Sequence, residues 1–344
     1  MRVLMTAGYY GLGGTSTVIE NLASQLCKKG LDVTISALMF GRIPSSGPYD
    51  VSILAVHNVS KLKRFLDGFN IVHNHHSITN YLALISRTPL VYHYHGSPNL
   101  GGGSPLGLGM LLSVKAMNHA FDAVVAVSES GAAELNSYFG INNVHVIHNG
   151  VNTKLFRDGL DERFRKGTPQ FLFVGNFYKH KNVEELILAL KELVKAYPKV
   201  HLQIVGGGPR YDAIRRFAAE LKLEDHVELV GRVSDAQLPY YYSSCNVYVT
   251  ASRWELFGLP LLEAMACGKP VVASSIPPHV ELLTKSKAGM LYTGGSVEDL
   301  CKKMTKTYEE GDKYRAEALE FAKEHDWSTV ANQVLRIYAQ ILHN

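Results

Sequence analysis

The strongest constraint on the fold is an alternation of strand-like and helix-like segments that begins at the first residues. An apolar run at residues 2–7 is followed by a glycine-rich loop, a helical periodicity at 15–29 and a second apolar run at 32–38. Alternating strands and helices predict a parallel sheet with helices on both faces. The chain is therefore expected to have an α/β fold.

The alternation restarts after a stretch at residues 157–168 that is rich in charge and ends in Gly-Thr-Pro. The pattern predicts two doubly wound, Rossmann-like parallel sheets, one in a domain of residues 1–160 and one in a domain of residues 161–327. Ligands bind at the carboxyl ends of the strands in open α/β sheets. We therefore expect these ends to face each other across a central cleft.

Composition argues against several classes of protein. The 344 residues are 46% hydrophobic, enough for two cores, and the net charge of +4 is too small and too scattered for a dedicated nucleic-acid binder. The four cysteines form no CxxC pair, and no apolar run approaches the roughly 20 residues of a membrane span. We expect a cytoplasmic protein with at most peripheral contact to a membrane.

The loop Gly11-Leu12-Gly13-Gly14-Thr15 precedes the first predicted helix. It does not follow the GxGxxG pattern, and the second strand ends without the acid that a nicotinamide dinucleotide site uses for the ribose. Backbone N–H groups at a helix N-terminus attract an anion. Gly13 and Gly14 therefore belong either to an anion-binding loop or to a purely structural turn.

Residues 251–270 carry two acids around an apolar helix. Pro260 suits the first turn of that helix, and Gly268 ends it. A helix that is apolar on all sides is typical of a buried helix, yet this one contains Glu263, and Glu255 lies just before it. Either the helix N-terminus simply stabilises an acid, or the two acids accept hydrogen bonds from a polyol at the cleft wall.

The segment from Glu255 to Glu263 resembles the Glu-x7-Glu signature of glycosyltransferase family four, whose members have the GT-B fold. Further segments resemble the motifs of that family in the same order, at residues 11–15, 70–75, 91–96, 146–152 and 205–209. The resemblance implies a retaining transferase that moves a hexose-type sugar from a nucleoside-diphosphate sugar. A UDP-sugar is the favoured donor, and the acceptor is a carbohydrate, a lipid-linked compound or a small molecule.

The resemblance also implies where the parts of the reaction lie. The N-terminal domain is expected to form the acceptor side, with the C-terminal helix at 328–344 packing back on it, and the second domain to bind the nucleotide sugar without a metal. Glu255 is expected to meet hydroxyls of the donor sugar as a catalytic residue, and Glu263 to bind the ribose. Backbone N–H groups of Phe257, Gly258 and Leu259 are expected to contact the sugar or phosphate.

The expected phosphate contacts depart from the family pattern. Lys181 falls on the position of a family lysine, whereas Asn176 falls on the position of an arginine and cannot supply a bidentate cationic fork. Lys181 is therefore expected to be the catalytic clamp on the diphosphate, with Lys179 or Arg210 supplying further charge. Arg232 lies where the family holds the nucleotide base.

Histidines gather at two of the predicted strands. His73 and His75 share one face of a strand, as do His93 and His95, so a metal site is an alternative. No acidic or cysteine ligand lies nearby in the sequence, and the resemblance accounts for these residues without a metal by placing His95 beside the transferred sugar. For His73 and His76, a structural role and a role on the acceptor side both remain open.

Two other functions remain as alternatives. An inverting GT-B transferase would share the fold, although the glutamate pair in its helix context disfavours it. A catalytically impaired sugar-nucleotide-binding protein is supported by Asn176. Residues 97–115 are either a flexible loop that leads into a core helix, or a lid or apolar groove for a lipid-linked acceptor.

Overall fold

The computed structural model describes residues 1–344 apart from 12, 43, 45–46, 97–113, 116–117 and 344. The chain forms two compact units, Met1–Gly150 with Trp327–Asn344, and Val151–Asp326. The chain thus first passes from one unit to the other between Gly150 and Val151. This point precedes the charged stretch at 157–168, from which the sequence predicts a boundary at residue 160. Val151 is tied to the far end of its own unit, because its N–H donates to the His325 carbonyl at 2.9 Å and it forms a parallel bridge with Asp326.

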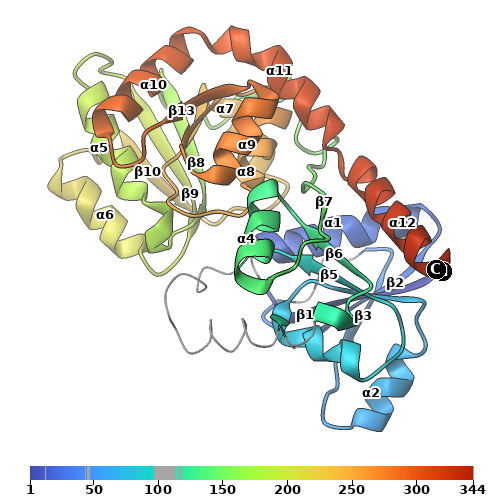
Figure 1. Ribbon diagram of the computed structural model, residues 1–344. Helices are drawn as coiled ribbons and strands as arrows, with labels where there is room; N and C mark the ends of the chain where they lie inside the picture. Colours follow the sequence, from blue (N-terminus) through green and yellow to red (C-terminus); the bar gives the residue numbers. More distant parts are fainter. Residues whose placement is uncertain (12, 43, 45–46, 97–113, 116–117, 344) are drawn as a thin grey trace. The chain divides into compact units, whose positions relative to one another are not determined.

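The first unit contains a seven-stranded sheet (Figure 1) with the strand order β3-β2-β1-β4-β5-β6-β7, and its strand pairs are parallel. The strands span Arg2–Tyr10 (β1), Asp32–Phe40 (β2), Asp50–Ile53 (β3), Ile71–Asn74 (β4), Leu90–Tyr94 (β5), Ala123–Ala126 (β6) and His145–Val146 (β7). Val3, Leu4 and Met5 in β1, an interior strand of this sheet, are completely buried. Consecutive buried side chains are typical of a strand covered on both faces.

Helices of the first unit follow the strands along the chain. They span Gly14–Lys28 (α1), Val59–Leu66 (α2), Glu129–Phe139 (α4) and Trp327–His343 (α12), with 3₁₀ segments at Ser77–Leu84 (η1) and Asn118–Ala120 (η2). The last helix, α12, packs beside α1, so the end of the chain belongs to the first unit. The expected lid or groove at 97–115 lies outside the described residues, apart from residues 114–115.

The second unit contains a six-stranded sheet with the order β10-β9-β8-β11-β12-β13, again with parallel pairs. Its strands span Gln170–Asn176 (β8), His201–Gly207 (β9), Val227–Gly231 (β10), Val247–Thr250 (β11), Val271–Ser274 (β12) and Gly289–Tyr292 (β13). Two parallel α/β sheets confirm the predicted fold class. The strand order places β8 between β9 and β11, so the loops after β8 and β11 emerge side by side.

Two groups of helices cover this second sheet (Figure 1): α5 packs with α6 and α10, whereas α11 packs with α8 and α9. The helical segments span Lys179–Lys181 (η3), Val183–Leu193 (α5), Tyr211–Glu220 (α6), Leu238–Ser244 (α7), Leu259–Ala266 (α8), Pro277–Ser286 (α9), Val297–Glu309 (α10) and Gly311–Glu324 (α11). Helix α8 buries Leu261, Leu262 and Met265. An apolar helix is buried here because α11 covers it.

Among the residues that the structure describes, none of the helices combines the length and the apolar character that crossing a membrane would require.

Gly206 provides a test of the close packing between β9 and β8. A Cβ atom at this position would lie 1.9 Å from the Gly175 carbonyl oxygen of β8, and the φ angle is +133°. Gly206→Ala is therefore expected to destabilise the second unit by about 3 kcal/mol or more, because neither the backbone conformation nor the neighbouring carbonyl can adapt. Chemical denaturation monitored by circular dichroism measures the change.

Gly207→Ala is the matched control. Its Cβ would meet the Arg232 side chain at 3.2 Å, and that side chain can move. Equal unfolding midpoints for the two variants would contradict the proposed constraint at Gly206.

Candidate active site

Lys181 and Glu255 form an ion pair at the carboxyl edge of the second sheet. Lys181 ends η3, which follows β8, and Glu255 lies in the loop after the adjacent strand β11. The Lys181 ammonium bonds to Glu255 Oε1, and the Ser252 hydroxyl donates to the same oxygen at 3.0 Å. The two charged side chains are only 16% and 17% exposed. The sequence motifs point to both residues but do not indicate that they touch.

The surroundings keep Glu255 ionised. Burial raises the pKa of its carboxyl group, but the Lys181 ammonium, the nearby His279 and the hydrogen bonds from Lys181 and Ser252 together lower the pKa below its usual value. His279 is itself completely buried, and its Nδ1 lies 3.0 Å from the Ser274 carbonyl oxygen. The site therefore holds a carboxylate with an ammonium against it, an arrangement that can meet a sugar hydroxyl and a phosphate together.

Glu263 lies in a different environment, although it is only eight positions further along the chain. It belongs to α8, and the Tyr242 hydroxyl donates to its Oε2 at 2.7 Å. Burial raises the pKa of the Glu263 carboxyl group to about 7, the Tyr242 hydrogen bond opposes that shift, and Asp235 adds to it. Glu263 therefore titrates near neutral pH in the unliganded protein, whereas Glu255 is charged.

The turn between the two acids requires a glycine. Gly258 adopts φ +103° and ψ +57° at the N-cap of α8, and its carbonyl accepts from the Leu261 N–H at 3.0 Å. Phe257 is buried against the protein. Because the chain enters α8 at Leu259, this turn forms the helix N-terminus, where peptide dipoles attract a negative charge.

Asn176 and Arg232 also meet at the carboxyl edge of the sheet. Asn176 ends β8, Arg232 follows β10, and the Arg232 guanidinium donates to Asn176 Oδ1 at 3.3 Å. The position at which the family pattern has an arginine thus has a guanidinium beside it, supplied by a residue far away in sequence. Arg210, a sequence candidate for this additional charge, is instead ion-paired with Glu184.

The three predicted site residues of the first unit are Gly13, Gly14 and His95. Gly14 begins α1 and Gly13 precedes it, so both lie at a helix N-terminus, and no atom lies within 4 Å of a Cβ added at Gly13. His95 follows β5, and its Nε2 lies 2.9 Å from Nδ1 of His75. Burial, together with the neighbouring His93 and His76, holds the pKa of His95 well below its ordinary value.

His73 and His76 have identifiable structural partners. His73 bonds through Nδ1 to the Tyr338 hydroxyl of α12 at 2.6 Å and through Nε2 to His93 at 3.1 Å. The His76 side chain accepts from the Ile78 N–H and caps η1. His73 and His76, for which the sequence left two roles open, thus both have structural contacts.

A metal ion is the alternative explanation for this cluster, since His73, His75 and His93 each offer a ring nitrogen within 4.8 Å of the others. An imidazole binds a metal along a lone pair in the plane of its ring. Here the rings of His73 and His75 are stacked at 22° and those of His73 and His93 at 13°, so their planes run nearly parallel instead of converging. The ring geometry favours hydrogen-bonded imidazole pairs over a shared metal ion.

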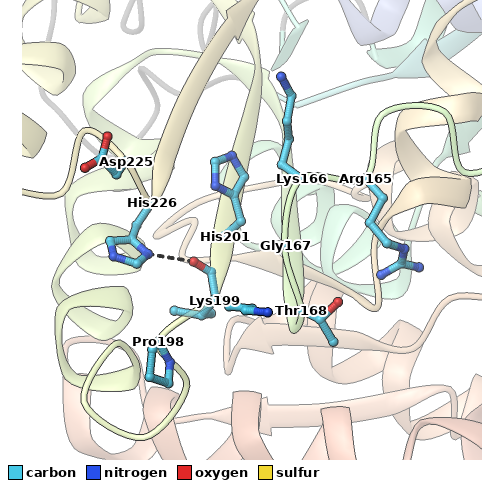
Figure 2. A pocket seen from close by; sticks show the side chains of 10 residues that line it. Arg165, Lys166, Gly167, Thr168, Pro198, Lys199, His201, Asp225 and His226 are labelled. Atoms are coloured by element: carbon cyan, nitrogen blue, oxygen red, sulfur yellow. Dashed lines mark hydrogen bonds between the residues drawn. The ribbon is translucent and has the colours of Figure 1, made fainter.

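A separate hollow of about 620 Å³ lies in the second unit (Figure 2). Arg165, Lys166, Lys199, His201 and His226 line it together with Asp225. His201 begins β9 and His226 immediately precedes β10, so the hollow lies at the amino ends of the strands. It contains none of the predicted site residues, and those of the second unit lie towards the opposite, carboxyl edge of the sheet.

Comparison with known proteins identifies the class to which this fold and these residues belong. Residues 160–325 match the family described as glycosyl transferases group 1, and residues 12–155 match glycosyltransferase family 4. The chain belongs to this retaining family of GT-B glycosyltransferases, which transfer a sugar from a nucleotide sugar. The resemblance inferred from the glutamate pair is thereby confirmed.

Individual relatives cover almost the whole chain. An uncharacterized glycosyltransferase of Methanocaldococcus jannaschii is 26% identical, over 99% of each chain. The GDP-mannose:cellobiosyl-diphosphopolyprenol alpha-mannosyltransferase of Komagataeibacter xylinus is 27% identical, over 96% of this chain and 90% of its own. The structure of Anabaena HepE in complex with UDP is similar in fold, with a TM-score of 0.85 at 20% identity, over 99% of this chain and 100% of the other.

The raised pKa of Glu263 gives a prediction for stability. Its carboxyl group binds a proton more tightly in the folded state, so its contribution to stability is full below pH 4.5 and is lost as the pH rises towards 7. Glu263→Gln has no charge to bury. It is expected to gain stability relative to the wild type between pH 4.5 and 7, by up to roughly 3 kcal/mol. Urea denaturation across this range, without donor, measures the difference.

Glu298→Gln on the surface of α10 serves as the control for this comparison, because the Glu298 side chain is 83% exposed. A pH-independent difference between Glu263→Gln and the wild type would rule out the proposed protonation of Glu263.

Proposed function

We propose that the protein is a metal-independent, retaining hexosyltransferase that uses a nucleoside-diphosphate sugar, with a UDP-sugar favoured. The observation that carries this proposal is the part-buried Lys181–Glu255 pair at the carboxyl edge of the second sheet, with Glu263 in the following helix. Charged side chains that are withdrawn from water need compensating partners. A part-buried ion pair is weak evidence for stability, so its position at the edge of the sheet where ligands bind favours a role in ligand binding.

The donor occupies the second unit in this proposal. Glu255 accepts hydrogen bonds from hydroxyls of the donor sugar and stabilises positive charge that develops at the anomeric carbon. Glu263 accepts from the ribose hydroxyls, which favour its carboxylate form. The backbone N–H groups of Phe257, Gly258 and Leu259 contact the sugar or the phosphates at the start of α8.

The diphosphate leaving group is held by side chains in place of a metal ion. Lys181 is the principal cation, since its ammonium already lies beside the sugar-binding carboxylate. Arg232 adds the guanidinium that Asn176 lacks, and the Asn176 amide oxygen orients it. The same contact argues against a catalytically impaired binding protein, because the apparent loss of charge at Asn176 was the reason to consider one.

The first unit, extended by α12, is proposed to present the acceptor. Gly13 and Gly14 offer backbone N–H groups at the start of α1, and His95 contributes beside the transferred sugar. The leaving phosphate takes the proton of the acceptor on the face where the bond forms. The polyprenol-linked acceptor in the name of the Komagataeibacter relative supports a lipid-linked acceptor, and the UDP bound to HepE supports a UDP-sugar.

A donor panel tests this function. Thermal shifts with UDP-, GDP-, ADP- and TDP-sugars identify the donor, and the best binder is then incubated with carbohydrate and lipid-linked acceptors, with and without EDTA. We expect sugar transfer that survives EDTA, and a product with the anomeric configuration of the donor by NMR. An inverted product, or binding with neither hydrolysis nor transfer, would contradict the proposal.

Lys181→Ala is expected to reduce kcat by roughly two to three orders of magnitude, because the diphosphate loses its principal cation in the transition state. Steady-state kinetics with the donor found by the panel measure the change. Lys199→Ala, in the hollow at the opposite edge of the same sheet, removes an equal charge and should keep nearly full activity. Near-normal turnover of Lys181→Ala would remove Lys181 from the mechanism.

A further inference from the structure

Four imidazole rings form a compact array at the ends of two neighbouring strands of the first unit. His73 and His75 come from the end of β4, and His93 and His95 from the end of β5. The ring centroids of the contacting pairs lie 4.4 to 5.2 Å apart. His73, His75 and His93 are almost completely buried, and His95 is partly exposed. The array thus reaches the outside of the unit through His95.

Two hydrogen bonds run across the array from one strand to the other. Nε2 of His73 lies 3.1 Å from Nδ1 of His93, and Nδ1 of His75 lies 2.9 Å from Nε2 of His95. A hydrogen bond between two neutral imidazoles requires one nitrogen with a proton and one without. Among the described residues, Nε2 of His75 has no hydrogen-bond partner and is shielded from solvent.

The unpartnered nitrogen distinguishes the two possible arrangements of the His75–His95 bond. If His95 donated, the proton of His75 would be on Nε2, which would leave a buried N–H group without an acceptor. If His75 donates from Nδ1, its Nε2 is an unprotonated nitrogen without a donor. Buried N–H groups without partners are rarer than acceptors without partners, so the second arrangement is favoured.

We propose that His75 is a positioning residue that holds His95 in the tautomer with its proton on Nδ1, so that His95 offers a neutral N–H donor to an oxygen atom of the substrate. The assignment follows from the hydrogen bond at Nε2 of His95, which must then be the acceptor. The substrate role rests on the function proposed above. In this role His95 is a hydrogen-bonding group and not a proton-transfer catalyst.

The groups that face His95 are His75 and His76 from the end of β4 and His93 at the end of β5, with His73 and the Tyr338 hydroxyl of α12 behind them. Of these, His93 and His76 oppose a positive charge on His95, as burial does. Within the described part of the chain, no carboxylate is among the partners that the structure gives for His95. Burial and neighbouring imidazoles also lower the pKa of His75 and His93 well below the ordinary value, so the array stays neutral.

NMR of the full-length protein labelled with ¹⁵N-histidine tests the tautomer directly. His95 is expected to show a protonated Nδ1 and an unprotonated Nε2, unchanged between pH 5.5 and 8.5, with its signals assigned by their loss in His95→Gln. A proton on Nε2 of His95, a doubly protonated ring at pH 6, or stoichiometric bound metal by elemental analysis would each overturn the proposal. This readout does not depend on activity.

Two substitutions at His75 test the link to catalysis. The side-chain amide introduced by His75→Asn would place an N–H donor near the position of Nδ1, whereas His75→Leu removes the donor. We expect kcat to fall about ten- to hundred-fold in His75→Leu with a small change in the KM for the donor, and to be largely restored in His75→Asn. His93→Leu, which removes a stacked ring but not the hydrogen bond to His95, should resemble the wild type more closely.

Equal losses in His75→Leu and His75→Asn at equal thermal stability would mean that His75 acts through packing, which overturns the proposal. An absence of transfer by the wild type with every donor would instead refute the proposed function, and the NMR experiment would still decide the tautomer.

Discussion

Parallel pairing is the constraint on which both functional clusters depend. Because the paired strands within each sheet run in the same direction, their carboxyl ends meet at one edge, and the loops that leave that edge bring together residues far apart in the chain. In the second unit this edge joins Lys181 to Glu255 and Asn176 to Arg232. In the first unit it joins His75 to His95.

The two clusters use opposite electrostatic strategies. The second unit gathers formal charge, with an ammonium and a carboxylate paired at low exposure and a guanidinium nearby. Lys181 is already largely withdrawn from solvent beside Glu255, so a phosphate group that replaced the carboxylate would meet a cation with little water left to lose. The first unit gathers neutral imidazoles whose burial disfavours protonation. A neutral N–H group can orient a sugar by a hydrogen bond without attracting the negatively charged leaving group.

The two glutamates show how environment separates residues of one type. Both were recognised from a single motif, yet Lys181 and Ser252 stabilise the charged form of Glu255, while Glu263 meets a tyrosine hydroxyl and titrates near pH 7. In the proposed function, a ribose hydroxyl donates to the Glu263 carboxylate and takes the place of the proton. Donor binding would then be coupled to the ionisation of Glu263 and not to that of Glu255.

The sequence alone determined the two α/β units, the buried helix α8 and the acids before and within it, because strand and helix periodicity and local turn chemistry depend on near neighbours in the chain. The motif around Glu255 and Glu263 was also sufficient for the family. Only the tertiary structure decided that Lys181 touches Glu255, that Arg232 reaches Asn176 and that His75 bonds to His95. These contacts depend on strand order and burial, since β8 lies between β9 and β11 and β4 lies beside β5, and no local pattern in the chain encodes which strands become neighbours.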